Sequence, residues 1–220
     1  FKKIQDVLHE YQILFVADEV ICGFGRTGRM FGTETYDLKP DMISLAKALS
    51  SGYQPISALM VSEDIFNLIA KESQKIGIFG HGYTYGGHPV PCAVALEAMK
   101  IYKQMDLIGH VGKIAPTLQN GLSKLNNHPL VGEARGVGLI GALELVKNKQ
   151  TREAFNISDG VGALLATRIQ ANGLISRAMG DSLAFAPPLI IETSQIDEML
   201  AIVKQSLDET LKILIDNGLK

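Results

Sequence analysis

The stretch that decides the fold runs from Ile13 to Leu49 and reads ILFVADEVICGFGRTGRMFGTETYDLKPDMISLAKAL. An apolar run at 13–17 ends at Asp18 and Glu19, and a second apolar run at 42–46 ends at Lys47. Short, unbroken apolar runs are typical of strands buried on both faces of a parallel sheet. Because ligands bind outside the carboxyl ends of such strands, we expect a carboxylate and an amine at the same edge of one sheet.

These two kinds of charged group indicate a particular chemistry. Desolvating either one is costly, so a charged group at a buried strand end is expected to have a partner or a task. A buried lysine with a lowered pKa is a nucleophile for carbonyl groups. A carboxylate that pairs with a ring nitrogen, together with a lysine that bonds an aldehyde, is the arrangement that holds pyridoxal phosphate. Chemistry alone does not decide between Asp18 and Glu19 as the ring partner.

Several blocks of the chain, at residues 14–21, 23–28, 40–41 and 45–49, resemble the class III aminotransferases in order and spacing. This pyridoxal-phosphate-dependent family includes the ω-amino acid:pyruvate transaminases. The chain resembles the C-terminal portion of such enzymes, whose upstream part also contributes to the cofactor site. The resemblance implies an α/β protein of fold-type I, with residues 1–105 as the C-terminal part of the large cofactor-binding domain and 106–220 as the small α+β C-terminal domain.

The resemblance also assigns roles to five residues. Lys47 is the expected catalytic residue, the Schiff-base lysine that bonds the cofactor and then carries a proton. Asp18 is expected to pair with the pyridine nitrogen, and Val20 to pack on one face of the ring. Thr84 is expected to bind the cofactor phosphate of the neighbouring subunit, which implies a homodimer with shared active sites. Arg177 is expected to bind a substrate carboxylate, for which its planar guanidinium is suited.

The implied reaction moves an amino group from an amine or ω-amino acid donor to a keto acid such as pyruvate. An aminomutase or a decarboxylating transaminase of the same family would use the same residues, although Arg177 favours a carboxylate-bearing substrate. Outside the family, the segment from Gly23 to Gly28 fits G-x-G-x-x-G, which in a nicotinamide-dependent oxidoreductase must open a helix. The residues after it lack helical periodicity, so a glycine-rich loop is preferred. An inactive remnant that only dimerises is the other alternative.

The bulk properties describe an ordinary globular protein. The chain has 220 residues, 46% of them apolar, and a net charge of −2, which gives no basic surplus for binding nucleic acid. No apolar stretch approaches the roughly 20 residues that span a bilayer, so no membrane segment and a cytoplasmic location are expected. Cys22 and Cys92 are expected to be reduced and buried. His81 and His88 lack a third ligand at suitable spacing, so no metal site is expected.

Periodicity and turn residues predict the remaining elements. The segments 23–40 and 77–91 are predicted as glycine-rich loops, and a capping box is expected at Ser194 and Asp197. Helices are predicted over residues 1–11, 64–75, 92–105, 107–125, 161–169 and 194–211, and strands over 13–17, 42–46, 56–61, 137–145, 174–177 and 183–186.

Overall fold

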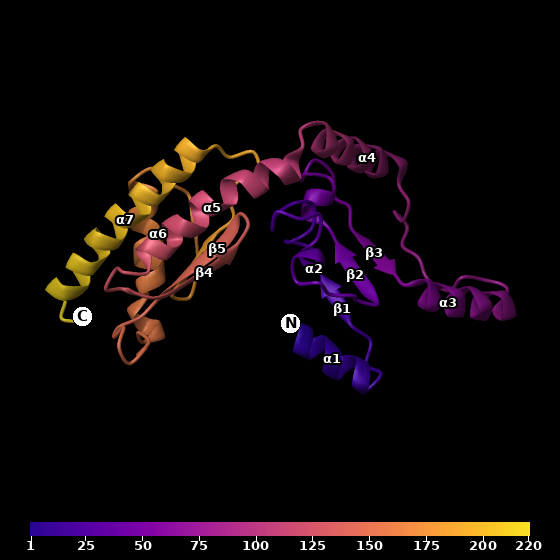
Figure 1. The fold of residues 1–220 in the computed structure, drawn as a ribbon, viewed down its shortest axis with the longest axis horizontal. Coiled ribbons are helices and arrows are strands. Elements are labelled where there is room, and N and C mark those ends of the chain that lie inside the picture. The colour runs from indigo at the N-terminus through magenta and orange to yellow at the C-terminus, as the bar shows by residue number, and fades with distance from the viewer. The chain divides into compact units, whose positions relative to one another are not determined.

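The computed structural model describes all 220 residues, which divide into two compact units, Phe1–Ile108 and Gly109–Lys220. The first unit holds a small sheet and four α-helices (Figure 1). Its elements are α1 (Lys2–Glu10), β1 (Val16–Asp18), α2 (Gly32–Thr35), β2 (Met42–Leu45), the 3₁₀-helix η1 (Lys47–Leu49), β3 (Ala58–Val61), α3 (Glu63–Ile76) and α4 (Pro89–Gln104).

The sheet of the first unit has three strands in the order β1-β2-β3. β1 and β2 are parallel, as predicted, and Asp18 lies opposite Ser44 in their register. β3 is antiparallel to β2, because residues 46–57 contain only η1 and a turn, and not the crossover that a parallel return needs. Both apolar runs therefore end at the same edge of the sheet.

The expectation that these strands are buried on both faces is wrong within this chain. Val16 in β1 is 51% exposed and Leu59 in β3 is 60% exposed. The apolar cluster of the unit is small and centres on four buried residues, Phe24, Leu45, Leu49 and Ala95. From β2, Leu45 belongs to this cluster and Ile43 packs against it, whereas Val16 and Leu59 lie outside it and stay exposed.

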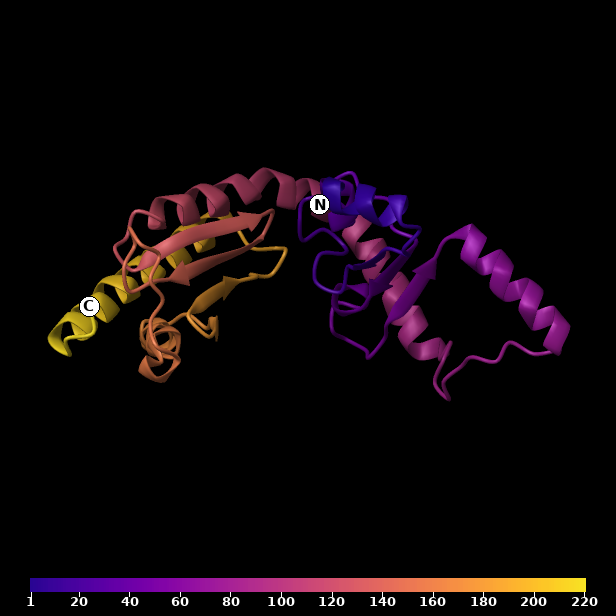
Figure 2. The ribbon, with the colours of Figure 1, turned by 90° about the horizontal axis from the view of Figure 1, so that it is seen from below.

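The second unit is a four-stranded antiparallel sheet with three α-helices. The strand order is β4-β5-β7-β6, and Figure 2 shows α5 running along this sheet. The elements are α5 (Leu107–Leu125), β4 (Val131–Val137), β5 (Ile140–Leu145), the 3₁₀-helix η2 (Ile157–Asp159), α6 (Val161–Ala171), β6 (Arg177–Met179), β7 (Ser182–Phe185) and α7 (Thr193–Asp216).

The core of the second unit lies on one face of the sheet. Alternate residues are buried along β5 and β7, as expected for strands with one covered face. Leu143 and Leu183 from these strands pack in one cluster with Leu118 of α5, Leu165 of α6 and Leu207 of α7. The predicted α+β character of this segment is confirmed.

Several details of the sequence prediction are wrong, among them the strand predicted over 174–177, which begins only at Arg177. The strand predicted over 137–145 is the second half of a hairpin, because Gly138 adopts a positive φ of 57° and turns the chain between β4 and β5. The capping box of α7 uses Glu192 and Gln195, two residues before the expected pair. Cys22 and Cys92 are free thiols that are half-buried and not fully buried. No helix combines the length and apolarity needed to cross a bilayer.

Candidate active site

Asp18 is the last residue of β1, and two donors hold one of its carboxylate oxygens. The Ser44 hydroxyl donates to Oδ1 over 2.9 Å, and the backbone N–H of Val20 donates to the same oxygen over 3.1 Å. These bonds, first that from Val20 and then that from Ser44, lower the pKa of Asp18 from its usual value, with a further contribution from the positive charge of Lys47. The carboxylate is therefore held ionised at an exposed edge of the sheet.

Glu19, the neighbour of Asp18, has a different environment. Its side chain is turned inward and is only 3% exposed. Its carboxylate accepts hydrogen bonds from the backbone N–H groups of Gly32, over 2.9 Å, and Thr33, over 2.6 Å, in the first turn of α2. A carboxylate that satisfies helix N-terminal N–H groups is a capping group. The structure thus separates the two carboxylates that chemistry alone left open, because Glu19 is committed to the fold and Asp18 faces outward.

Lys47 begins η1, directly beyond the end of β2. Its φ is 40°, in the left-handed region that non-glycine residues rarely adopt. Such a conformation costs on the order of 1 kcal/mol and is found disproportionately at functional sites. The expectation of a buried lysine is wrong within this chain, where Lys47 is exposed, because the turn projects its side chain beyond the last covered residue of β2.

The turn that carries Lys47 is tied to its surroundings by hydrogen bonds. The Tyr102 hydroxyl of α4 donates to the carbonyl oxygen of Ala48 over 2.7 Å. The buried Ser50 hydroxyl donates to the carbonyl oxygen of Gln54 over 2.6 Å. The Leu49 N–H donates to the carbonyl of Ala46 over 2.8 Å. Hydrogen bonds at the residues before and after Lys47 therefore fix its strained backbone conformation.

The glycine-rich segment after Val20 forms a series of turns. Gly25 and Gly28 have φ values of 113° and 84°, which a residue with a β-carbon adopts only with strain. The segment does not open a helix, since α2 begins later, at Gly32. The helix that a dinucleotide fingerprint must open is therefore missing. Residues 23–40 are predicted as a loop, and the single helical turn of α2 departs from that prediction. Val20 is half-buried between Asp18 and these turns.

Thr84 lies in the exposed loop between α3 and α4 of the same unit. Its neighbours Tyr83 and Tyr85 line a cavity of about 740 Å³ together with Ile56, His88 and other residues of the loop and of residues 54–57. His88 ends the loop by capping α4, since its Nδ1 accepts a hydrogen bond from the N–H of Val90. No contact within the chain joins Thr84 to Asp18 or Lys47.

Arg177 is the first residue of β6, in the second unit, and its side chain is exposed. Arg177 makes no ion pair with the nearby Asp181, whose carboxylate accepts a hydrogen bond from the N–H of Gly162 over 2.9 Å. No carboxylate of the chain lies within ion-pair distance of Arg177. By contrast, Arg135 is paired with Glu144 over 3.0 Å and is structural.

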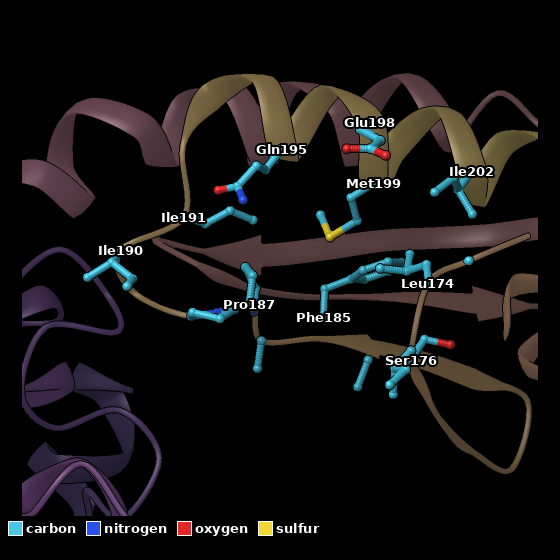
Figure 3. A pocket seen from close by; sticks show the side chains of 15 residues that line it. Leu174, Ser176, Phe185, Pro187, Ile190, Ile191, Gln195, Glu198, Met199 and Ile202 are labelled. Carbon is cyan, nitrogen blue, oxygen red and sulfur yellow. The ribbon is translucent and has the colours of Figure 1, made fainter.

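The segment just before Arg177 forms a wall of a second cavity, of about 520 Å³, within the second unit (Figure 3). Most of the labelled residues that line this cavity are apolar, among them Phe185, Ile191 and Met199. The carboxylate of Glu198 lies above the cavity, on α7. The Ser176 hydroxyl is buried without a hydrogen-bond partner. The cavity is an apolar recess with few polar groups.

The structure therefore brings Asp18, Val20 and Lys47 to one edge of one sheet. Thr84 belongs to the same unit, and Arg177 to the other. Sequence reasoning missed Ser44 as the donor to Asp18. The parallel register of the structure places Ser44 opposite Asp18. Aligning the ends of the two apolar runs would instead place Lys47 there, so the sequence pattern held no signal for Ser44.

Several known proteins are similar to this chain in sequence. The family model described as aminotransferase class-III matches residues 1–207. The chain is 48% identical over 212 residues to a tomato (Solanum lycopersicum) protein named gamma aminobutyrate transaminase 1, mitochondrial, covering 96% of this chain and 41% of that protein. It is also 48% identical to a rice (Oryza sativa subsp. indica) protein named probable gamma-aminobutyrate transaminase 3, mitochondrial, with the same two shares.

Solved structures give the same result. A transaminase with L-ala is 48% identical, has a TM-score of 0.94, and is matched over 97% of this chain and 50% of its own. An ω-transaminase from Pseudomonas jessenii in complex with PMP is 45% identical, with a TM-score of 0.92, over 96% of this chain and 47% of its own. The predicted fold-type I class is confirmed by these structures.

The chain spans about two fifths of the length of the curated relatives and half or less of these solved chains. These shares give the extent of the match and not its place within the relatives, so the expected C-terminal position is not confirmed. The family model nevertheless covers nearly the whole sequence. The chain belongs to the class III aminotransferases.

Proposed function

We propose that the protein is a transaminase that moves an amino group from an amine or ω-amino acid donor to a keto acid such as pyruvate. The observation that carries this proposal is the placement of an ionised Asp18 and a strained Lys47 at the ends of two adjacent parallel strands. The names of the tomato and rice relatives favour γ-aminobutyrate, an ω-amino acid, as the donor.

The residues present fit pyridoxal phosphate, the cofactor that class III aminotransferases use. Asp18 would accept a hydrogen bond from the protonated pyridine nitrogen, because its carboxylate is kept ionised and one of its oxygens has no donor in the chain. Val20 would pack against one face of the ring. Lys47 would bond the aldehyde carbon, since its amine extends from the same edge of the sheet.

Bound pyridoxal phosphate supplies an electron sink for the negative charge left when a proton leaves the carbon next to the transferred nitrogen. Lys47 is the group that would take that proton and return it, since its amine is freed when the substrate amine replaces it. Asp18 would keep the ring nitrogen protonated, which strengthens the sink. Arg177 would hold the substrate carboxylate through paired hydrogen bonds.

The proposal extends to the assembly and the cellular location. The Thr84 hydroxyl would bind the cofactor phosphate of a partner subunit, in a homodimer whose sites are shared. Its exposure in a glycine-rich loop supports this, because hydroxyls and loop N–H groups are phosphate ligands. Residues 1–105 would belong to the large cofactor-binding domain and 106–220 to the small domain. We propose the cytoplasm as the location, although similar tomato proteins are named mitochondrial and chloroplastic.

The test uses the full-length protein, Lys47→Ala and a control, Lys71→Ala, at an exposed position of α3. Wild type and Lys71→Ala should show the visible absorption of lysine-bound pyridoxal phosphate, lose it on borohydride reduction, and then carry the cofactor on Lys47 in a peptide mass map. Before reduction, wild type and Lys71→Ala should also form alanine from pyruvate and γ-aminobutyrate. Alanine formation at the wild-type rate by Lys47→Ala, or attachment at another lysine, would refute the proposal.

A further inference from the structure

We infer that Ser44 is a positioning residue that holds Oδ1 of Asp18 and so leaves Oδ2 for the pyridine nitrogen of the cofactor. The inference rests on the proposed function and adds to it the residue that orients the ring partner.

Both donors to the Asp18 carboxylate take the same oxygen. The Ser44 hydroxyl lies 2.9 Å from Oδ1 and the Val20 N–H lies 3.1 Å from Oδ1. Oδ2 has no donor in the chain. A carboxylate oxygen has two lone pairs, so these two bonds satisfy Oδ1 and fix the rotation of the carboxylate plane. The remaining oxygen is the acceptor that a protonated ring nitrogen needs.

The position of Ser44 follows from the strand register. Asp18 and Ser44 are partners across the parallel β1–β2 pair, so their side chains project on the same face of the sheet. Lys47 follows three residues later, beyond the end of the same strand β2. One strand thus orients the carboxylate and also presents the amine, which couples the two contacts to the cofactor.

Removal of the hydroxyl alone should loosen the carboxylate without unfolding the sheet. Ser44 is a half-buried strand residue, and valine and threonine are well tolerated in strands. Ser44→Thr keeps a hydroxyl, whereas Ser44→Val has nearly the shape of threonine without it. The pair therefore separates the hydrogen bond from a change in packing. Ser62→Ala serves as a control, because Ser62 is also half-buried at a strand end and makes no side-chain cap bond.

The experiment uses the full-length protein loaded with pyridoxal phosphate labelled with ¹⁵N in the ring. In Ser44→Val the ¹⁵N chemical shift should move toward that of an unprotonated pyridine, and the dissociation constant for pyridoxal phosphate should rise about tenfold, as for loss of a bond to a charged group. Ser44→Thr should stay within about threefold of wild type. Ser62→Ala should match wild type in both readouts.

Asp18→Asn is the reference that separates this inference from the proposed function. If Asp18→Asn changes the ¹⁵N shift and Ser44→Val does not, Ser44 has no positioning role and only this inference is overturned. If Asp18→Asn leaves the ¹⁵N shift and the dissociation constant unchanged, the assignment of Asp18 is overturned and the inference with it. Equal losses in Ser44→Thr and Ser44→Val would also overturn it, because the hydroxyl would then be irrelevant.

Discussion

The hydroxyl of Tyr102, on α4, donates a 2.7 Å hydrogen bond to the carbonyl oxygen of Ala48, the residue directly after Lys47. The Tyr102 ring and Ala48 also pack against the buried cluster of the first unit. A helix distant in sequence thus anchors the turn from which the proposed catalytic amine projects. The anchor counteracts the tendency of the left-handed Lys47 backbone to relax to a common conformation.

Tyr102→Phe keeps the ring in the cluster and removes only this hydrogen bond. The free energy of unfolding should fall by about 1 kcal/mol, the usual net value of one such bond. In the full-length enzyme kcat should fall severalfold with KM little changed, because the substrate contacts remain. Urea unfolding and steady-state kinetics measure the two effects. Tyr53→Phe is the control, since Tyr53 is 79% exposed, and equal stability of both variants would contradict the prediction.

Glu19→Gln tests whether the buried carboxylate is structural. The glutamine side chain has one acceptor oxygen, so its NH₂ group would face either the Gly32 or the Thr33 N–H, which now both point at Glu19. The free energy of unfolding should fall by about 2 kcal/mol, as for loss of a bond to a charged group together with an unsatisfied donor. Chemical denaturation measures it. Glu34→Gln, exposed on the same helix α2, should cost a few tenths of a kcal/mol at most.

The placement of Asp18 and Lys47 at the ends of adjacent strands was largely predictable from the sequence, because it depends on where apolar runs stop. A run that ends at Asp18 and another that ends at Lys47 predict a shared edge once the strands are taken as parallel. Their parallel pairing is confirmed. The helices at 1–11, 64–75, 107–125 and 161–169 are also confirmed within a few residues, since their apolar spacing is strong.

Other features depend on contacts that no local pattern contains. The capping role of Glu19 depends on the N–H groups of Gly32 and Thr33 in α2, which lie thirteen and fourteen residues further along the chain. The bond from Tyr102 to Ala48 spans 54 residues. The exposure of β1 and β3 could not be foreseen from the sequence. An apolar run indicates that a strand needs to be buried, but it does not show whether residues of the same chain cover it.

Acid should remove one stabilising interaction in the second unit. The Ser182 hydroxyl, and next the Arg135 guanidinium, hold the pKa of Glu144 below its ordinary 4.5. A carboxylate whose pKa is lower in the folded state stabilises the fold above its unfolded pKa, and that contribution is lost as the pH falls through its folded pKa. Glu144→Gln should cost about 0.5 kcal/mol at neutral pH, since the side chain is part-exposed, and almost nothing near pH 3. Urea unfolding of both proteins at the two pH values measures this, and a cost that is the same at both would contradict it.

Arg177 should affect substrates according to their charge. Its guanidinium is exposed and has no carboxylate partner in the chain, so it is available to a substrate. In the full-length enzyme, Arg177→Gln should raise KM at least tenfold for a donor that bears a carboxylate, as expected for loss of a paired hydrogen bond. An amine donor without a carboxylate should be affected less than threefold. Steady-state kinetics with the two donors measure this, and equal effects on both would indicate a structural role.

Gly162 should tolerate no side chain. It lies in the first turn of α6, where its N–H donates to the Asp181 carboxylate and where an added β-carbon would overlap the carbonyl oxygen of Gly180. Because that oxygen is backbone, the β6–β7 turn must move, and Gly162→Ala should lower the free energy of unfolding by about 2 kcal/mol. Gly112→Ala is the matched control, since Gly112 lies in α5 with open space around its α-carbon, and there alanine should stabilise by about 0.5 kcal/mol. Thermal and urea unfolding of the two variants should therefore shift in opposite directions, and a Gly162→Ala protein as stable as wild type would contradict the prediction.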